Sequence, residues 1–366
     1  MKVKIGDLTK IKTGKLDANV SSEDGKYPFF TCSKEPLKIS TYSYDCECVL
    51  VAGNGDLNVK YYNGKFDAYQ RTYIIEDNGS GKLYMPYLYY FMEDYIDELR
   101  KQAIGGVIKY IKLANLTDAL IELPSVDEQK SIVEILKKVK GILDKRNDEI
   151  RELDNLIKAR FVELFECGDH EIVKASDVCD FITKGTTPPT GEITEEYENG
   201  KIPFLKVYNL SFTGEMLFDE NPQYILAETH NGKLARSKVY PNDVLMNIVG
   251  PPLGKFTLVT DEFEEWNINQ AIAIFRAKER ILPRFLLHAL MQPKVLEPFI
   301  GQAVGIRQQN LSLEQCRNLQ FPLPSLEEQK SFVEFAEQLD KSKVAVQAAL
   351  DKAQLLFDSL MQEYFG

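Results

Sequence analysis

The tripeptide Glu128-Gln129-Lys130 has the residue types and spacing that close a nuclease motif, in which a carboxylate and a lysine activate water beside a metal ion. That chemistry also requires a strand and an upstream aspartate. Here the tripeptide follows Pro124 and Ser125, and Pro124 disfavours a helical residue before it. Ser125 and Glu128 have the S-x-x-E spacing of a capping box, which pairs the free N–H groups of a first helical turn. Helix capping therefore accounts for these residues without catalysis.

Three further segments could hold a phosphate or a cofactor. The loop GNG at 53–55 lacks the lysine and hydroxyl of a phosphate-binding loop, and GPPLGKF at 250–256 has the wrong spacing. The segment NPQY at 221–224 lacks the second proline of an adenine-methylating motif, and no dinucleotide-binding or S-adenosylmethionine motif accompanies it. We interpret all three segments as turns, and we expect no catalytic residue in this chain.

The cysteines and histidines do not have metal-site spacing. The six cysteines include no CxxC pair, and the three histidines do not complete a zinc set, so we expect no bound metal. Scattered cysteines are typical of reduced thiols, and we find neither a signal peptide nor an apolar segment long enough to span a membrane. These features predict a cytoplasmic protein that does not contact a membrane.

The charge balance restricts the binding partners. The formal net charge is −11, whereas a protein that coats nucleic acid needs an excess of lysine and arginine to neutralise phosphates. This charge still allows DNA reading through small basic patches, and it allows a partner protein to supply the basic surface.

A long repeat organises the chain. LPSVDEQKSIVE at 123–134 matches LPSLEEQKSFVE at 323–334 in nine of twelve positions, and Ser325 with Glu328 repeats the capping box. Asp127 and Glu327 add negative charge where the helix dipole is positive. Each copy therefore predicts the start of a helix.

Apolar residues then recur at alternating steps of four and three, the heptad spacing of a coiled coil. Shifting the first seam by 200 positions gives a second seam in which Lys343 is the one charged residue. The first seam consists of Ile132, Leu136, Val139, Leu143, Arg146, Ile150, Leu153, Ile157, Arg160 and Leu164. The second consists of Phe332, Ala336, Leu339, Lys343, Val346, Leu350, Ala353, Phe357, Leu360 and Tyr364.

The remaining segments predict two related, strand-rich globules. Matching strand patterns occur in the same order in both halves, as in YDCECVLVAGNGD at 44–56 and YPNDVLMNIVGPPLG at 240–254. We expect an α+β fold with a pseudo-two-fold internal repeat, whose two long helices pack as an antiparallel coiled coil. The expected parts are a first globule at 1–122, a helix at 123–167, a second globule at 168–322 and a helix at 323–366.

Two related globules joined by helical spacers suit a target with two parts. DNA with two half-sites is one such target, because each globule would read one half and helix length would set the gap. A coiled-coil adaptor with two protein-binding globules is the alternative, and it explains the duplication and acidity equally well.

The chain resembles the specificity subunits of Type I restriction–modification systems over essentially its whole length. Besides the repeated LPS-x-(D/E)-EQK, the resemblance is carried by YPF at 27–29, IPF at 202–204, VLVAGNG at 49–55, GKFDAYQRTY at 64–73, ITKGTTPP at 182–189 and NINQAIAIFR at 267–276. It implies two target-recognition domains that read a bipartite, asymmetric sequence in double-stranded DNA. It also implies that the helices set the spacing and dock two modification subunits.

The resemblance further implies a non-catalytic chain without a cofactor of its own. S-adenosylmethionine would belong to the modification subunits, which methylate adenine, and ATP and Mg²⁺ would belong to the restriction and translocase subunits. DNA contacts require cationic, amide and hydroxyl side chains. On that basis we select Thr31, Ser33, Lys34, Gln70, Arg71, Lys184, Thr186, Thr187, Lys206, Tyr208, Asn209 and Arg307.

Overall fold

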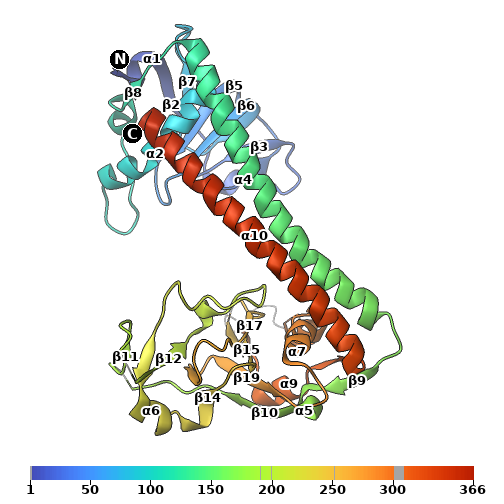
Figure 1. Cartoon of the computed structure of the whole chain (residues 1–366). Helices are drawn as coiled ribbons and strands as arrows, with labels where there is room; N and C mark the ends of the chain where they lie inside the picture. Colours follow the sequence, from blue (N-terminus) through green and yellow to red (C-terminus); the bar gives the residue numbers. More distant parts are fainter. Residues whose placement is uncertain (1, 190, 199, 251, 301–308) are drawn as a thin grey trace. The chain divides into compact units, whose positions relative to one another are not determined.

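The computed structural model describes residues 2–189, 191–198, 200–250, 252–300 and 309–366. It divides into two compact units, one of residues 1–147 with 347–366 and the other of residues 148–346. The long helices α4 (Val126–Phe161) and α10 (Leu326–Phe365) each contribute a segment to both units (Figure 1). Within the described part of the chain, none of the helices combines the length and the apolar character needed to cross a membrane.

A six-stranded sheet forms the centre of the first unit, with strand order β2-β7-β5-β6-β3-β4. All neighbouring strands run antiparallel except β3 and β6, which pair in parallel through Phe29 with Asp67 and Phe30 with Ala68. A separate two-stranded sheet joins β1 to β8. The strands are β1 (Lys2–Lys4), β2 (Thr9–Thr13), β3 (Tyr27–Phe30), β4 (Leu37–Ile39), β5 (Tyr44–Ala52), β6 (Val59–Ala68), β7 (Thr72–Asp77) and β8 (Leu120–Glu122).

Short helices and one longer helix complete the first unit. Helix α2 carries a buried face that includes Leu88, Met92 and Leu99, and these side chains join the core formed with Val49 and Ile75 of the sheet. The helices are α1 (Ile5–Leu8), η1 (Ala18–Val20), α2 (Met85–Gln102) and α3 (Leu113–Thr117).

Among its described residues, the second unit divides its strands among four small sheets. Their strand orders are β10-β19-β15-β17, β11-β13-β12-β18-β14, β16-β20 and β21-β9. The strands are β9 (Glu171–Lys174), β10 (Cys179–Lys184), β11 (Ile193–Thr194), β12 (Lys201–Leu205), β13 (Tyr224–Leu226), β14 (Lys238–Val239), β15 (Val244–Asn247), β16 (Val249–Gly250), β17 (Phe256–Leu258), β18 (Trp266–Ile268), β19 (Ile272–Ala277), β20 (Gln309–Asn310) and β21 (Gln320–Leu323). Its shorter helices are η2 (Val162–Glu166, a π-helical turn), α5 (Ala175–Val178), η3 (Val207–Asn209), α6 (Ala227–Asn231), η4 (Ala235–Ser237), α7 (Pro283–Leu290), α8 (Pro293–Ile300) and α9 (Leu313–Arg317).

The two units repeat one strand plan. Strand β12 pairs in parallel with β18, as β3 does with β6, and β15 pairs antiparallel with β19, as β5 does with β7. The single long strand β6 of the first unit has two shorter counterparts in the second unit, because residues 259–265 separate β17 from β18. The α+β fold with an internal repeat, predicted from the sequence, is confirmed.

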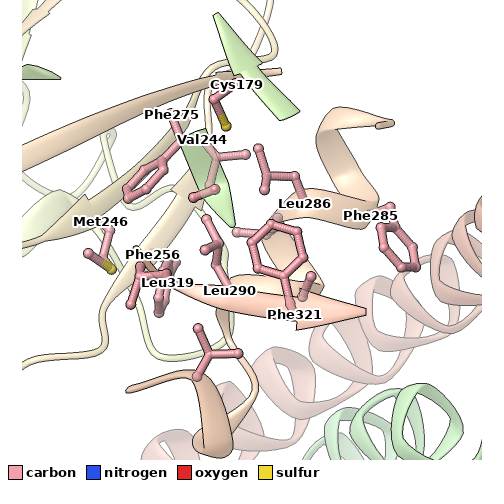
Figure 2. Close-up of a cluster of buried hydrophobic side chains, with 14 of the residues drawn as sticks. Cys179, Val244, Met246, Phe256, Phe275, Phe285, Leu286, Leu290, Leu319 and Phe321 are labelled. Carbon is pink, nitrogen blue, oxygen red and sulfur yellow. The ribbon is translucent and has the colours of Figure 1, made fainter. Parts of the chain in front are cut away.

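One core cluster of the second unit lies between its sheets and α7. Val244 of β15, Phe275 of β19 and Leu286 of α7 each have no exposed surface, and Figure 2 shows their side chains gathered in one cluster. Phe321 of β21, which is 1% exposed, extends the same cluster. This core holds β10, β17 and β19, whose ends lead into the loops at 184–187, 253–255 and 269–271.

The long helices pack antiparallel, as predicted. In the second unit, Phe161 of α4 stacks edge-on with Phe332 of α10 at 5.4 Å between ring centroids, and Asp154 contacts Lys343. The residue number falls along α4 as it rises along α10, which defines the antiparallel direction. Every residue of both predicted seams is buried or half-buried.

Candidate nucleic-acid interface

In the first unit, Gly14 brings the loop after β2 against the turn between β6 and β7. Its N–H donates to the carbonyl of Thr72 at 3.0 Å, and a Cβ at this position would lie 2.2 Å from the carbonyl oxygen of Ala68. Only glycine permits this approach. The turn N–H of Gln70 also donates to the carbonyl of Leu16 at 2.9 Å, so the two loops form one surface.

The segment after β3 joins the same turn. The N–H of Tyr69 donates to the carbonyl of Phe30 at 2.9 Å, and the amide of Asn58 donates to the carbonyl of Cys32 at 2.8 Å. These bonds place Ser33 and Lys34 beside the turn that carries Gln70 and Arg71. Two groups of residues selected from sequence therefore lie together, although about forty residues separate them in the chain.

The glycine loop after β5 completes the group. The N–H of Gly53 donates to the carbonyl of Arg71 at 2.8 Å, and the N–H of Gly55 donates to the carbonyl of Lys109 at 2.9 Å. The N–H of Ile111 donates back to the carbonyl of Gly53 at 3.0 Å. We define the first loop surface as residues 14–16, 31–34, 53–58, 69–71 and 104–110. Its exposed cations are Lys15, Lys34, Arg71 and Lys109.

One edge of the first loop surface is apolar. Val107 is fully exposed and Ile108 is 61% exposed, at the tip of a loop closed by the paired residues Ile104 and Tyr110. Gly105 in this loop has a φ of 124°, a conformation that favours glycine. Lys109 follows the two apolar side chains directly, so the tip combines apolar contact area with a cation.

The second unit builds the same junction from different side chains. The N–H of Gly185 donates to the carbonyl of Ile272 at 3.0 Å, and a Cβ there would lie 2.0 Å from the carbonyl oxygen of Asn269. The N–H of Asn269 donates to the carbonyl of Leu205 at 3.1 Å, which attaches the segment after β12. The N–H of Ile248 donates to the carbonyl of Ala271 at 2.8 Å, as the N–H of Gly53 does to that of Arg71.

Side-chain bonds connect the loops of this second junction. Thr187 Oγ1 donates to Gln270 Oε1 at 2.6 Å, and Arg236 Nε donates to Thr186 Oγ1 at 3.0 Å. We define the second loop surface as residues 184–187, 206–208, 253–255 and 269–271 together with Arg236. Its cations are Lys184, Lys206, Arg236 and Lys255, which are exposed or half-buried.

The residues selected from sequence differ in accessibility. Thr31 is 6% exposed, and its hydroxyl accepts the N–H of Ser33 at 3.2 Å. Asn209 has no exposed surface: its Oδ1 accepts the N–H of Lys206 at 2.8 Å and its Nδ2 donates to the carbonyl of Leu217 at 3.1 Å. Both residues hold loops in place and are unsuited to base contact. Arg307 lies outside the described residues. The accessible members are Ser33, Lys34, Gln70, Arg71, Lys184, Thr186, Thr187, Lys206 and Tyr208.

Both long helices begin with the hydrogen bonds of a capping box. The N–H of Ser125 donates to Glu128 Oε2 at 2.8 Å, and the N–H of Glu128 donates to Ser125 Oγ at 3.3 Å. Ser325 and Glu328 form the same two bonds at 2.9 and 3.3 Å. The hydrogen bonds from each serine hold the pKa of Glu128 and of Glu328 below the usual value. The acidic residue of the repeated EQK is therefore occupied in capping.

Sequence reasoning missed Gln129 and Gln329, the middle residues of the repeated EQK. Both side chains have no exposed surface, and each forms hydrogen bonds to the globule of its own unit. The only indication in the sequence was that a glutamine occurs at this position in both copies of the repeat. The sequence alone does not distinguish a buried glutamine from one on the exposed face of a helix.

A family model described as the Type I restriction modification DNA specificity domain matches residues 1–153 and 168–353. The chain belongs to this family. Its members are DNA sequence-specificity subunits, so membership does not favour the adaptor alternative. Specificity subunits of this family have no catalytic role and hold no cofactor of their own. Among the described residues, no group of three or more His, Cys, Asp or Glu side chains is arranged to hold a metal ion.

Individual relatives agree with this assignment. The chain is 37% identical over 156 residues to the specificity subunit of the Type I restriction enzyme EcoDI from Escherichia coli, covering 43% of this chain and 34% of that protein. It is 23% identical to the EcoBI specificity subunit of Escherichia coli, covering 87% of this chain and 73% of the relative. It is 25% identical to the MjaVIII specificity subunit of Methanocaldococcus jannaschii, covering 92% and 85%.

Two solved structures share the fold. The S subunit of a Type I restriction–modification system from M. genitalium superposes with a TM-score of 0.58 at 17% identity, covering all of this chain and 96% of that chain. A chain from a structural study of complex assembly and conformational transition in the Type I system gives a TM-score of 0.57 at 18% identity, covering 100% and 97%.

Proposed function

We propose that the first and second loop surfaces each read one half of a bipartite, asymmetric sequence in double-stranded DNA. The domains at 1–122 and 168–322 act as the two target-recognition domains. The single observation that carries this proposal is that one loop junction is built twice, with the same backbone bonds and different exposed side chains. Arg71 in the first junction has Ala271 as its counterpart in the second, so the two surfaces suit two different half-sequences.

The local charge of the loop surfaces supports DNA binding despite the acidic chain. Four cations gather on each surface, and lysine or arginine at a loop tip neutralises phosphates. Gln70 and Arg71 have the donors that base edges in the major groove accept, and Val107 and Ile108 suit thymine methyl groups. We assign sequence reading to these exposed side chains and positioning to the lysines.

The long helices set the distance between the half-sites and dock two modification subunits. Those subunits carry S-adenosylmethionine and methylate adenine, while restriction and translocase subunits supply ATP- and Mg²⁺-dependent cleavage. The modification subunits also supply basic surface that this chain lacks. Because the substrate is chromosomal DNA, the complex acts in the cytoplasm.

Reconstitution tests this proposal. The purified chain, its modification subunit and S-adenosylmethionine are incubated with a library of random DNA duplexes, and methylated adenines are located by sequencing. We expect one bipartite sequence with a fixed gap. Methylation of the same sites by the modification subunit alone would contradict the proposal.

The adaptor alternative gives a different result in the same assay. An adaptor would join the modification subunits without selecting a sequence, so methylation would depend on the chain but would show no shared motif.

A variant with Lys34, Arg71 and Lys109 replaced by alanine tests the first loop surface. It should still bind the modification subunit and should lose selection of one half-sequence only.

A further inference from the structure

Gln129 joins the first turn of α4 to the segment that leads into α2. Its Oε1 accepts the N–H of Tyr84 at 2.8 Å, and its Nε2 donates to the carbonyls of Lys82 and Pro124, both at 2.9 Å. The side chain has no exposed surface. Two of these three bonds cross from the spacer helix to the globule.

Gln329 forms the same arrangement in the second unit. Its Oε1 accepts the N–H of Leu282, the residue before α7, at 2.8 Å. Its Nε2 donates to the carbonyls of Arg280 and Pro324, both at 3.0 Å. This side chain also has no exposed surface. The two units therefore share a buried amide that bonds to equivalent backbone groups, at distances between 2.8 and 3.0 Å.

The chemistry of the contact requires glutamine. An amide accepts one bond and donates two here, whereas a carboxylate cannot donate and an ammonium cannot accept. Burying the amide is favourable only because each polar atom is paired. The conditions that favour glutamine are met in both copies independently.

The hydrogen bonds of Gln129 restrain the start of α4 in a direction-dependent way, which apolar packing does not. Val133 and Leu136 of α4 pack into the core of the first unit, but apolar packing is not directional and tolerates small rotations and shifts. The two bonds to backbone atoms of the globule, at 2.8 and 2.9 Å, are directional and restrict the position of the helix start. Gln129 therefore defines where the spacer helix begins relative to its recognition domain.

We propose that Gln129 and Gln329 are positioning residues that fix the gap at which the complex accepts two half-sites. This inference rests on the proposed function. Each glutamine locks one recognition domain onto the start of its spacer helix, so an error at either end changes the separation of the two reading surfaces. Neither side chain has exposed surface with which to contact DNA.

The test uses the complete modification complex with Gln129→Met, which keeps the volume and removes all three bonds. The substrates are duplexes that carry both half-sites with the natural gap or with a gap one base pair longer or shorter. We expect the preference for the natural gap over the altered gaps to fall about tenfold, because the bonds that join the globule to the helix start are lost. Gln329→Met should have the same effect, and both half-sequences should stay unchanged.

Gln102→Met is the matched control. Gln102 Nε2 donates to Glu98 Oε1 at 3.0 Å and its Oε1 accepts from Asn115 at 3.0 Å, so the variant removes side-chain bonds inside the same globule but none to α4. We expect it to lower the melting temperature without changing gap preference. A merely structural role for Gln129 would affect melting in the same way and leave gap preference intact.

The outcomes separate the two proposals. A wild-type complex that marks no bipartite sequence would overturn the proposed function and the inference with it. A wild-type complex with one preferred gap, together with folded Gln129→Met and Gln329→Met variants that keep the same preference, would overturn the inference alone.

Discussion

Lys343 of α10 donates a hydrogen bond from Nζ to Oδ1 of Asp154 in α4 at 2.7 Å. Its Nζ also lies 2.6 Å from Oδ1 of Asp340, one turn earlier on the same helix. Burial alone would lower the pKa of Lys343, but the bonds to the two aspartates raise it, so the lysine stays charged within the apolar seam. The second seam thus tolerates a cation because α4 supplies its counter-charge.

Lys343→Met should lower the free energy of unfolding by about 1–3 kcal/mol, because it leaves the half-buried carboxylate of Asp154 without its cation. Urea unfolding measures the change. Lys341→Met, at an exposed position on the same helix, is the control and should have little effect. The double variant Lys343→Met with Asp154→Leu should recover part of the loss. Equal stability of Lys343→Met and the wild type would show that the pair contributes nothing.

Ser125→Ala should destabilise the first unit by about 1 kcal/mol, since it removes the acceptor for the N–H of Glu128 at the start of α4. Ser131 provides a matched control, because its hydroxyl donates to the carbonyl of Asp127 within the helix at 2.9 Å and caps nothing. The melting temperature should fall for Ser125→Ala and stay unchanged for Ser131→Ala. Identical melting of both variants would be inconsistent with the capping role.

Arg71→Ala should weaken recognition of one half-sequence by about 1–3 kcal/mol, because Arg71 is exposed at the centre of the first loop surface. Methylation rates on duplexes with single substitutions in each half measure the effect. Specificity should relax in one half and remain in the other. Arg151→Ala, at an exposed position on α4 paired with Asp148, should leave both halves unchanged. If specificity for both halves fell equally, Arg71 would contribute to general DNA affinity and not to the reading of one half-sequence.

His288 should make the second unit less stable as the pH falls. Burial, followed by the nearby Arg284, lowers the pKa of this imidazole from 6.5 to about 4. In the unfolded chain this imidazole therefore takes up a proton below about pH 6.5, whereas in the folded chain it stays neutral until about pH 4. Because the unfolded state binds more protons in this window, the free energy of unfolding falls as the pH is lowered through it.

Urea unfolding of wild type and His288→Leu between pH 7.5 and pH 4.5 measures this dependence. We expect the free energy of unfolding to depend less steeply on pH in His288→Leu than in the wild type. A residual slope of the same sign should remain, since burial also lowers the pKa of His230, whose Nε2 lies 2.9 Å from Glu265 Oε2. An unchanged slope in His288→Leu would contradict the linkage.

The elements that local rules determine could be predicted from the sequence. The capped helix starts and the heptad seams depend on spacing within a few residues, and the structure contains both. The strand patterns at 44–56 and 240–254 became β5 and β15, with equivalent partners. The repeat made each prediction testable twice.

The details of the binding loops could not be predicted, because contacts between distant segments decide them. Asn209 has the residue type of a base reader, yet its amide is consumed in holding the chain from Lys206 to Leu217. Arg236 was not selected, although it reaches Thr186 across 50 residues of sequence. Gln129 looks like an ordinary surface residue of a helix until the fold brings residues 82–84 over it.

The most direct test of the central claim is a base-resolution map of adenine methylation across the genome, recorded with this chain present and after its deletion. We predict one asymmetric, two-part sequence methylated throughout the genome, which disappears on deletion while the modification subunit is still produced. Persistence of that methylated sequence without the chain would contradict its role as the subunit that selects the DNA target.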